Sequence, residues 1–284
     1  MACRPAEESA QSRPCLGGGS QFESILCDQE DRVHLSKVRS MSSYRDILYR
    51  DYSATFGGQK SLDACVQYAQ YEATYDALPS SRETSVADLG CGKGEWLAWM
   101  ASKGFVHLTG VDLSTSDLAI ARQNDPARIW VQENVITFLE THKAAFNLLH
   151  AKDIIEHFTK DEFIRFLTAA RCALKPGGEL WLLTFNAQSP LSSAIRYGDF
   201  THEIGLTPAS MAQCLRASGF SHISIQGRHY CSNSFNGRIR RVLGQIVFRL
   251  SRLLLKIRHG DAAKERGIDL HCTQPDLLTM ACKV

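Results

Sequence analysis

Residues 86–96 read VADLGCGKGEW, a short apolar run that ends in an acid and is followed by a glycine-rich turn. The acid is Asp88, and the alternate glycines are Gly90, Gly92 and Gly94. Glycine has no side chain, so another molecule can come close to the backbone at these positions. The helix-like segment that follows places a helix N-terminus here, where negative charge is favoured. The pattern therefore predicts a ligand-binding loop.

Three classes of ligand compete for such a loop. A phosphate-binding loop requires Ser or Thr after Gly-Lys, whereas Lys93 is followed by a glycine. A dinucleotide loop follows G-x-G-x-x-G, whereas Glu95 stands one residue after the third glycine. S-Adenosylmethionine has no phosphate, and its methionine carboxylate and ammonium would lie along the loop, where Asp88 is a useful acid. The loop therefore favours S-adenosylmethionine.

Polar residues after the next two strand-like segments agree with this ligand. Asp112 ends the second segment, about 20 residues after the glycines, where an acid can accept hydrogen bonds from both ribose hydroxyls. The third segment ends in Glu133 and Asn134, where a polar group can reach the adenine amino edge. The apolar side chains expected to sandwich the adenine ring are Val111, Leu113 and Val135.

Strand-like and helix-like segments alternate through the middle of the chain. Strands are expected in TSVADLG, HLTGVDLS, ARIWVQEN, FNLLHAKDI, ELWLLTF and FSHISIQGRHY, with helices among them and a break at KPGG. Such alternation implies βαβ units and a parallel sheet, whose ligands bind at the carboxyl ends of the strands. The predicted fold class is therefore α/β, a Rossmann-like, doubly wound and mostly parallel sheet.

The motifs VADLGCGKGEW, GVDLS, DIIEHF and ALKPGGELWLLT resemble the successive motifs of class I S-adenosylmethionine-dependent methyltransferases. The resemblance spans roughly residues 60–230 and implies a seven-stranded sheet, completed by the final strand-like stretch DLLTMACKV. It also implies that the glycine turn contacts the methionine part of the cofactor, and that Asp153 lies beside the transferable methyl. The residues assigned to the cofactor in this way are Asp88, Gly90, Gly92, Gly94, Asp112, Leu113, Glu133, Asn134 and Asp153.

The segment after the fourth strand, AKDIIEHF, bears on the methyl acceptor. Enzymes that methylate exocyclic amines of bases or glutamine amides typically carry Asn/Asp-Pro-Pro-Tyr/Phe there, and this segment has no Pro-Pro. Methyl transfer to oxygen is therefore favoured, and a hydroxyl must lose its proton during the transfer. His157 is the first candidate for general base, because histidine has an ordinary pKa of about 6.5. A structural role for this Glu-His pair, packing or orienting the cofactor loop, stays open beside it.

A second polar stretch, YGDFTHEIGLTPASM, follows the fifth strand. Its His202 and Glu203 are candidates for binding sugar hydroxyls or for the role of base, and a capping or hinge loop is the alternative. Together with the LRASGF that follows, the stretch resembles the C-terminal part of methyltransferases from polysaccharide and lipopolysaccharide gene clusters. That resemblance implies a hydroxyl of a sugar or of a lipid-linked saccharide as acceptor. No metal is expected, since no set of carboxylate and histidine ligands is evident.

Two other functions stay open from the sequence. One is O-, N- or C-methylation of a small secondary metabolite. The other is not catalytic: a module that binds the cofactor and scaffolds a membrane assembly. No nucleic-acid partner is expected, because the net charge is only +2 and the basic residues gather in one segment without interleaved aromatic residues.

The two ends of the chain differ in composition from its middle. Residues 1–40 are rich in Ser, Gly, Pro and charge, and we expect a flexible tail before a methyltransferase domain at 41–235. Residues 236–284 hold a basic amphipathic helix and the final strand. Apolar residues share one face of 238–258, and no acid interrupts this stretch. The helix is expected to lie on an anionic membrane surface, or to bury its apolar face on the domain or in a homodimer.

The expected location is the cytoplasm, with peripheral contact at the inner face of the membrane. The first 20 residues hold no apolar leader, and no run of about 18 apolar residues occurs. The ten cysteines are scattered without paired metal spacing, which is typical of reduced thiols.

Overall fold

The computed structural model describes residues 44–48, 64–190, 192–230, 234–263, 268–269 and 271–284. The chain divides into two compact units, residues 1–58 and 59–284. In the first unit the described residues form one short helix, α2 (Tyr44–Leu48). The tail expected at residues 1–40 lies outside the described residues. All the features below belong to the second unit.

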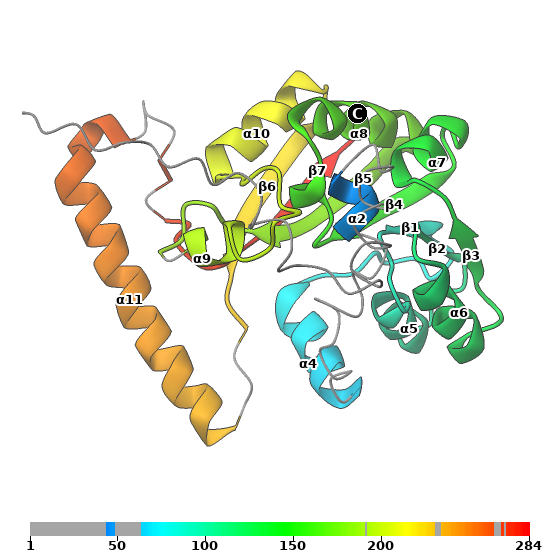
Figure 1. The fold of residues 1–284 in the computed structure, drawn as a ribbon, viewed down its shortest axis with the longest axis horizontal. Coiled ribbons are helices and arrows are strands. Elements are labelled where there is room, and N and C mark those ends of the chain that lie inside the picture. Colours follow the sequence, from blue (N-terminus) through cyan, green and yellow to red (C-terminus); the bar gives the residue numbers. More distant parts are fainter. Residues whose placement is uncertain (1–43, 49–63, 191, 231–233, 264–267, 270) are drawn as a thin grey trace, which may run out of the picture. The chain divides into compact units, whose positions relative to one another are not determined.

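The second unit is built on a seven-stranded sheet with the order β3-β2-β1-β4-β5-β7-β6 (Figure 1). Its strands are β1 (Val86–Leu89), β2 (Leu108–Asp112), β3 (Ile129–Gln132), β4 (Phe146–Lys152), β5 (Leu174–Phe185), β6 (Ser221–Arg228) and β7 (Asp276–Cys282). The first five are parallel, and β7 runs antiparallel between β5 and β6. The predicted fold class is confirmed, and the last strand completes the sheet as expected.

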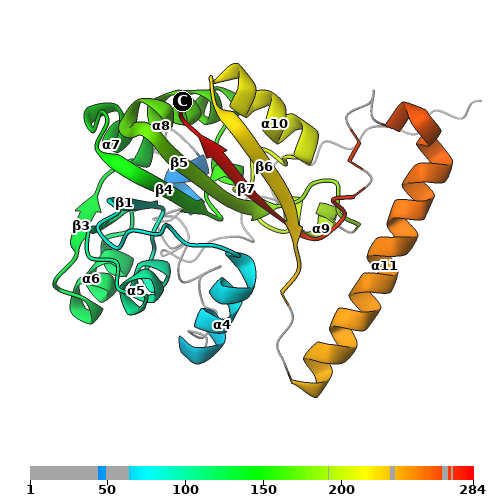
Figure 2. The ribbon, with the colours of Figure 1, turned by 180° about the vertical axis from the view of Figure 1, so that it is seen from behind.

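Helices cover both faces of this sheet (Figures 1 and 2). The helices described in this unit are α4 (Ala64–Thr74), α5 (Glu95–Ser102), α6 (Thr115–Asn124), α7 (Val135–Thr141), α8 (Lys160–Ala173), α9 (Ser192–Arg196), α10 (Pro208–Ala217) and α11 (Phe235–His259), with the 3-10 helices η2 (Ile155–His157) and η3 (Gly260–Ala263). One core joins α7, α8 and α10 to the sheet through residues such as Phe166 and Leu149. The other joins α4 and α5 to it through residues such as Trp99. Val86 and Ala87 lie in different cores, because neighbouring residues of a strand point to opposite faces.

Strong caps determine where the helices next to the site begin. Thr159 and Glu162 form a reciprocal capping box at the start of α8: the Thr159 hydroxyl accepts from the Glu162 N–H, and a Glu162 carboxylate oxygen accepts from the Thr159 N–H at 2.8 Å. Thr207 caps α10, and Pro208 stands at its first position, where a missing N–H costs nothing. The segments before Thr159 and Thr207 therefore end at defined places.

The KPGG sequence was expected to break the chain before the fifth strand, and this expectation was wrong. Residues 175–178 lie inside β5, which already pairs with β4 at Leu174. The register between β4 and β5 shifts between Phe146 and Leu148. Pro176 is tolerated in the strand because such an irregularity releases the N–H that a regular ladder would need.

The long helix α11 matches the predicted amphipathic segment. Two hydrogen bonds join it to residues 271–273: the Thr273 hydroxyl donates to the Phe248 carbonyl oxygen at 3.3 Å, and Arg252 donates to the His271 carbonyl oxygen at 3.2 Å. Its apolar side chains are nevertheless exposed, for example Leu250 at 53%. Among the described residues, no helix has the length and apolarity needed to cross a membrane.

Candidate functional site

The turn between β1 and α5 has left-handed backbone at its three glycines, with φ of 77° at Gly90, 51° at Gly92 and 81° at Gly94. A Cβ on Gly90 would lie 2.8 Å from the Ile154 side chain, and one on Gly94 would overlap the Trp130 ring. A Cβ on Gly92 would meet no atom within 4 Å. Gly90 and Gly94 thus make room for neighbouring side chains. Of the three, Gly92 faces open space, where a ligand can approach the backbone.

Asp112, at the end of β2, lies beside this turn. Its carboxylate accepts hydrogen bonds from the N–H groups of Gly92 and Ser114, each at 2.8 Å. Burial raises the pKa of Asp112, and these two hydrogen bonds oppose the rise. Asp112 therefore stabilises the turn at Gly92, the glycine that faces open space. Its binding of ribose hydroxyls stays a prediction.

The three apolar residues expected around adenine differ in their exposure to solvent. Leu113 is 65% exposed and offers an apolar surface next to Asp112. Val111 and Val135 are 0% and 4% exposed, so they belong to the core. The expectation that all three sandwich the ring was wrong for these two valines, because strand alternation and the start of α7 turn them inward.

The third strand ends in residues that organise the same edge of the sheet. The Glu133 N–H donates to the Asp112 carbonyl oxygen at 3.1 Å, which joins the ends of β3 and β2. The Asn134 side-chain oxygen accepts from the N–H groups of Ile136 and Thr137, so Asn134 is the N-cap of α7. Both residues lie at the predicted edge, and their contact with adenine stays a prediction.

Asp88 is buried beneath the turn and bonds to a side chain that the sequence did not suggest. Its Oδ1 accepts a hydrogen bond from His150 Nδ1 at 2.6 Å, and His150 Nε2 meets the Tyr75 hydroxyl at 2.5 Å. The Trp96 ring stacks on His150 with centroids 3.8 Å apart. The hydrogen bond between His150 and Asp88 therefore links β4 to β1 beneath the glycine turn. Its expected contact with the methionine part of the cofactor stays a prediction.

The variant His150→Leu is expected to lower the free energy of unfolding by about 3–5 kcal/mol, because the Asp88 carboxylate would stay buried without its partner. Urea denaturation of the full chain measures the loss. The control Tyr75→Phe removes one neutral hydrogen-bonding group and should cost about 1 kcal/mol. Equal small losses for the two variants would show that Asp88 does not depend on His150.

Asp153 follows β4 directly and has a φ of 51°, a conformation that is costly for a residue with a side chain. Its N–H donates to the Leu183 carbonyl oxygen at 2.9 Å, and its carboxylate pairs with Lys152, whose pKa it raises. The Asp153 side chain is 57% exposed. β4 is also the neighbour of β1 in the sheet. The structure thus presents an acid next to the glycine turn, and its proximity to the transferable methyl stays a prediction.

The segment after β4 is joined to the loop after β5. The carbonyl oxygen of Glu156, in η2, accepts hydrogen bonds from the N–H groups of Glu203 and Ile204 at 2.8 and 3.1 Å. This pairing brings together His157 and His202, the two candidate bases. One ligand atom from each of Glu156, His157 and His202 lies within 4.8 Å of the others. Glu203 takes part in this pairing through its backbone N–H, and its side chain does not belong to the cluster of Glu156, His157 and His202.

Hydrogen bonds define the protonated nitrogen of His157. The Thr201 hydroxyl donates to the Asp199 carboxylate at 2.7 Å, so its oxygen can only accept from His157 Nδ1, which lies 2.9 Å away. The neutral ring therefore carries its proton on Nδ1 and its basic lone pair on Nε2. Burial lowers the pKa of His157, and the neighbouring His202 lowers it further. The neutral, basic form is thus favoured at neutral pH.

Glu156, which the sequence indicated only as part of a Glu-His pair, is also a site residue. It is 4% exposed, and the Thr184 hydroxyl donates to its Oε2 at 3.0 Å. Burial raises the pKa of Glu156 to about 8, and the nearby Asp153 adds to the rise. Its position directly before His157 in the sequence indicated that it lies near the candidate base. Its meeting with His202 depends on pairing between distant segments, which local patterns do not reveal.

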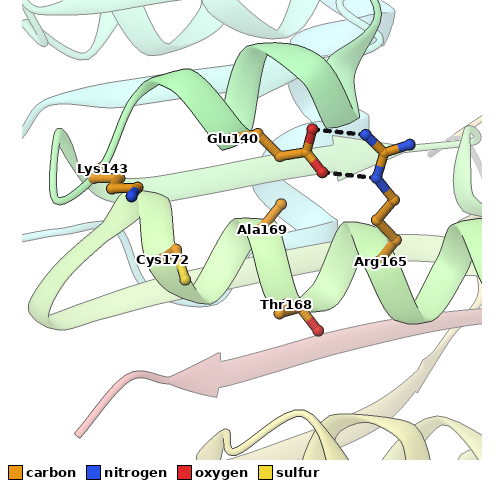
Figure 3. A pocket seen from close by; sticks show the side chains of 6 residues that line it. All are labelled: Glu140, Lys143, Arg165, Thr168, Ala169 and Cys172. Carbon is orange, nitrogen blue, oxygen red and sulfur yellow. Dashed lines mark hydrogen bonds and ion pairs between the residues drawn. The ribbon is translucent and has the colours of Figure 1, made fainter.

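A shallow pocket between α7 and α8 lies apart from these residues (Figure 3). Across it, Arg165 donates two hydrogen bonds of 2.6 Å to the two carboxylate oxygens of Glu140. The residues that line it are Glu140, Lys143, Arg165, Thr168, Ala169 and Cys172. None of them follows the carboxyl end of β1, β2 or β4, so this pocket is not the candidate site.

Comparison with known proteins adds to this geometry. Residues 86–178 match the family model described as a methyltransferase domain. A relative named ubiquinone biosynthesis O-methyltransferase, from Idiomarina loihiensis, is 27% identical over 161 residues, which are 50% of this chain and 63% of that protein. The chain thus matches less than two thirds of that relative's length.

Two solved structures have the same fold. A SAM-dependent methyltransferase from Archaeoglobus fulgidus superposes with a TM-score of 0.59 at 18% identity, over 83% of this chain and 99% of that one. Phosphoethanolamine N-methyltransferase 2 from Haemonchus contortus, solved in complex with S-adenosyl-L-methionine, gives 0.55 at 17% identity, over 86% and 61%. Residues 86–178 thus match a methyltransferase domain, and the sheet that carries them has the fold of class I S-adenosylmethionine-dependent methyltransferases.

Proposed function

We propose that this protein transfers the methyl group of S-adenosylmethionine to a hydroxyl oxygen of a membrane-borne acceptor, such as a lipid-linked saccharide. The observation that carries the proposal is the junction of His157 and His202 after β4, next to the glycine turn after β1. S-Adenosylmethionine, when bound, supplies a methyl group already activated by a sulfonium. The residues of the chain then have to orient the hydroxyl and remove its proton.

The residues at the carboxyl ends of three neighbouring strands fit this cofactor. Gly92 leaves the backbone open after β1, and Asp112 holds a carboxylate beside it after β2. Leu113 adds an exposed apolar surface, and Asp153 an exposed carboxylate after β4. The strand order reverses at β1, the usual place for a ligand on such a sheet. One extended molecule could therefore touch all four residues.

Oxygen is favoured over nitrogen as the acceptor atom. A neutral amine already has a nucleophilic lone pair, whereas a hydroxyl has to lose a proton, and the Asp199–Thr201–His157 chain presents a basic ring nitrogen for that purpose. The relative from Idiomarina loihiensis is named an O-methyltransferase. The similar structure from Haemonchus contortus is named an N-methyltransferase, so transfer to nitrogen is the alternative.

Helix α11 supports an acceptor at a membrane surface. Its 25 residues include no acid. One set of its side chains is apolar and exposed by 43–72%: Ile239, Val242, Leu243, Ile246, Val247, Leu250, Leu253, Leu254 and Ile257. The arginine and lysine residues of the same helix are Arg238, Arg240, Arg241, Arg249, Arg252, Lys256 and Arg258. An apolar stripe with purely basic flanks complements an anionic lipid surface.

The double variant Ile246→Asp/Leu250→Asp is expected to lose co-sedimentation with phosphatidylglycerol-containing vesicles, which the unmodified chain should show. Both side chains are more than half exposed, so the fold should tolerate the change. The matched control is Ile120→Asp/Ile164→Asp, which places the same two charges at exposed apolar positions of α6 and α8 and should leave sedimentation unchanged. A chain that forms dimers and never sediments with vesicles would assign the helix to a homodimer.

The proposed reaction is tested with S-adenosylmethionine that carries a labelled methyl group. The full chain is incubated with a total lipid extract and, separately, with the water-soluble fraction, and the labelled product is identified by mass spectrometry and NMR. The expected product is a methyl ether in the lipid fraction. A methylated amine would favour the nitrogen alternative, and label confined to the water-soluble fraction would contradict a membrane-borne acceptor.

A further inference from the structure

We propose that Glu156, His157 and His202 bind a divalent first-row transition cation. These residues lie in two segments, η2 and the loop after β5, which the backbone hydrogen bonds of Glu156 hold together. The sequence alone predicted no metal, because the ligand set is assembled only by the fold. Binding of the cation is independent of the proposed function, and the role given to it below rests on that function.

The three side chains are close enough to share one ion after small rotations. Their ligand atoms lie within 4.8 Å of one another. Bonds of about 2.0–2.2 Å at tetrahedral angles separate two ligand atoms by roughly 3.4 Å. The ligand atoms therefore have to approach one another by up to roughly 1.4 Å, which rotation about the side-chain bonds of the two histidines can supply.

The hydrogen bonds of both rings match those of metal-binding histidines. His157 donates its Nδ1 proton to Thr201, which is itself held by Asp199. His202 Nδ1 lies 3.0 Å from the Ile195 carbonyl oxygen, which can only accept, so this nitrogen also carries the proton. Each neutral ring therefore has its lone pair on Nε2. Histidine ligands of metals typically donate the other ring N–H to a carbonyl or carboxylate in this way.

The charge around Glu156 also favours a cation. Its carboxylate is 4% exposed, with the neutral hydroxyl of Thr184 as hydrogen-bond donor. The ammonium of Lys152 forms its ion pair with Asp153, so it offsets the charge of Glu156 only in part. A buried carboxylate is costly unless it is compensated. A divalent cation beside the two neutral rings would supply the missing positive charge.

Two imidazoles and one carboxylate suit a transition metal better than Mg²⁺ or Ca²⁺, which prefer oxygen ligands. Three protein ligands leave at least one coordination position for water or a substrate, as in catalytic zinc sites. The cluster follows β4, whose neighbour β1 leads into the glycine turn. The acceptor hydroxyl could therefore bind the cation next to the methyl donor.

The cation would change how the hydroxyl loses its proton. A bound cation polarises the hydroxyl oxygen, so the proton can leave to water and the histidines need not accept it. The alkoxide oxygen then forms a bond to the methyl carbon while the carbon–sulfur bond breaks. The sulfur keeps the electron pair of that bond, which gives S-adenosylhomocysteine and the methyl ether.

The test uses Co²⁺ alone as a visible-absorbing probe and the full chain. We expect one Co²⁺ per chain with visible absorption bands, and displacement of these bands by Zn²⁺. Glu156→Gln and His202→Ala should each weaken Co²⁺ binding by at least about 100-fold, and Thr201→Val, which disturbs the support of His157, by about 10–100-fold. The control His107→Ala changes an exposed histidine paired with Glu83 and should bind as the unmodified chain does.

Circular dichroism and thermal unfolding establish that each variant is folded, and S-adenosylmethionine binding is titrated in parallel. A chain that shows no cobalt bands, or variants that bind Co²⁺ like the unmodified chain, would overturn the inference. If S-adenosylmethionine still binds in that case, the proposed methyl transfer stands with His157 as base. If Co²⁺ binds and S-adenosylmethionine does not, the proposed function fails and the cation site stands.

Discussion

The variant Gly92→Leu is expected to abolish binding of S-adenosylmethionine, with a loss of at least about 100-fold in affinity, while the protein stays folded. A side chain at this position would project into the open space above the turn, where the cofactor has to approach the backbone. The left-handed φ of 51° adds a cost of about 1–2 kcal/mol to the folded state. Calorimetric titration measures the affinity, and thermal unfolding measures the cost.

The chain offers a matched control for this variant at Gly177. This glycine also has a left-handed φ, 74°, and a Cβ there would meet no atom within 4 Å. Gly177→Leu should therefore destabilise the folded backbone by a similar amount. Gly177 lies near the start of β5, whereas the glycine turn follows the end of β1, so this variant should bind the cofactor normally. Gly94→Leu should instead destabilise the protein, because its side chain would collide with Trp130. Undiminished binding by Gly92→Leu would remove the turn from the cofactor site.

The variant His157→Ala is expected to lower turnover by about 10²–10⁴-fold, with a much smaller change in the affinity for S-adenosylmethionine. The loss follows whether the ring takes the hydroxyl proton itself or holds a cation that promotes its release. Transfer of labelled methyl into the lipid extract measures the rate, and its dependence on S-adenosylmethionine concentration separates kcat from KM.

The control for this variant is His107→Ala, since His107 is exposed and pairs with Glu83 on the surface. We expect that control to retain full turnover. A second variant, Thr201→Val, keeps the His157 ring but removes the hydroxyl that orients it, and should lower kcat with little change in KM. Unchanged turnover in His157→Ala would leave His157 with a purely structural role.

Local patterns predicted most of the fold, because its elements are determined by short stretches of sequence. Buried apolar runs became β1, β2 and β4, and the Gly-rich turn lies between β1 and α5 as expected. The capping residue Thr159 defines the start of α8. The KPGG stretch misled, because Gly and Pro usually end strands and here they lie within an irregular part of β5.

The candidate site was predicted less completely, because much of it depends on contacts between distant segments. The sequence correctly placed Asp112 and Leu113 at the edge of the sheet that holds the candidate site. That placement requires only that the end of β2 be recognised, because the carboxyl ends of parallel strands share one edge. It could not show that Gly94 makes room for Trp130. Neither could it show that Asp88 bonds to His150, because that contact requires β1 and β4 to be neighbours.

The same limit explains the histidine cluster. His157 and His202 were each singled out as candidate bases, but nothing local indicated that they meet. Their meeting results from the backbone bonds between Glu156 and residues 203–204. These bonds also make Glu156, which the sequence indicated only as part of a Glu-His pair, the third member of a cluster of potential metal ligands.

We propose that the loops after β1, β2 and β4 form an S-adenosylmethionine site. The most direct test is calorimetric titration of the folded full chain with S-adenosylmethionine and with S-adenosylhomocysteine, with NAD as the comparison ligand. We predict that both methionine-derived ligands bind with a stoichiometry near one and that NAD does not. Binding of NAD in their place, or of none of the three by a chain shown to be folded, would contradict an S-adenosylmethionine site in these loops.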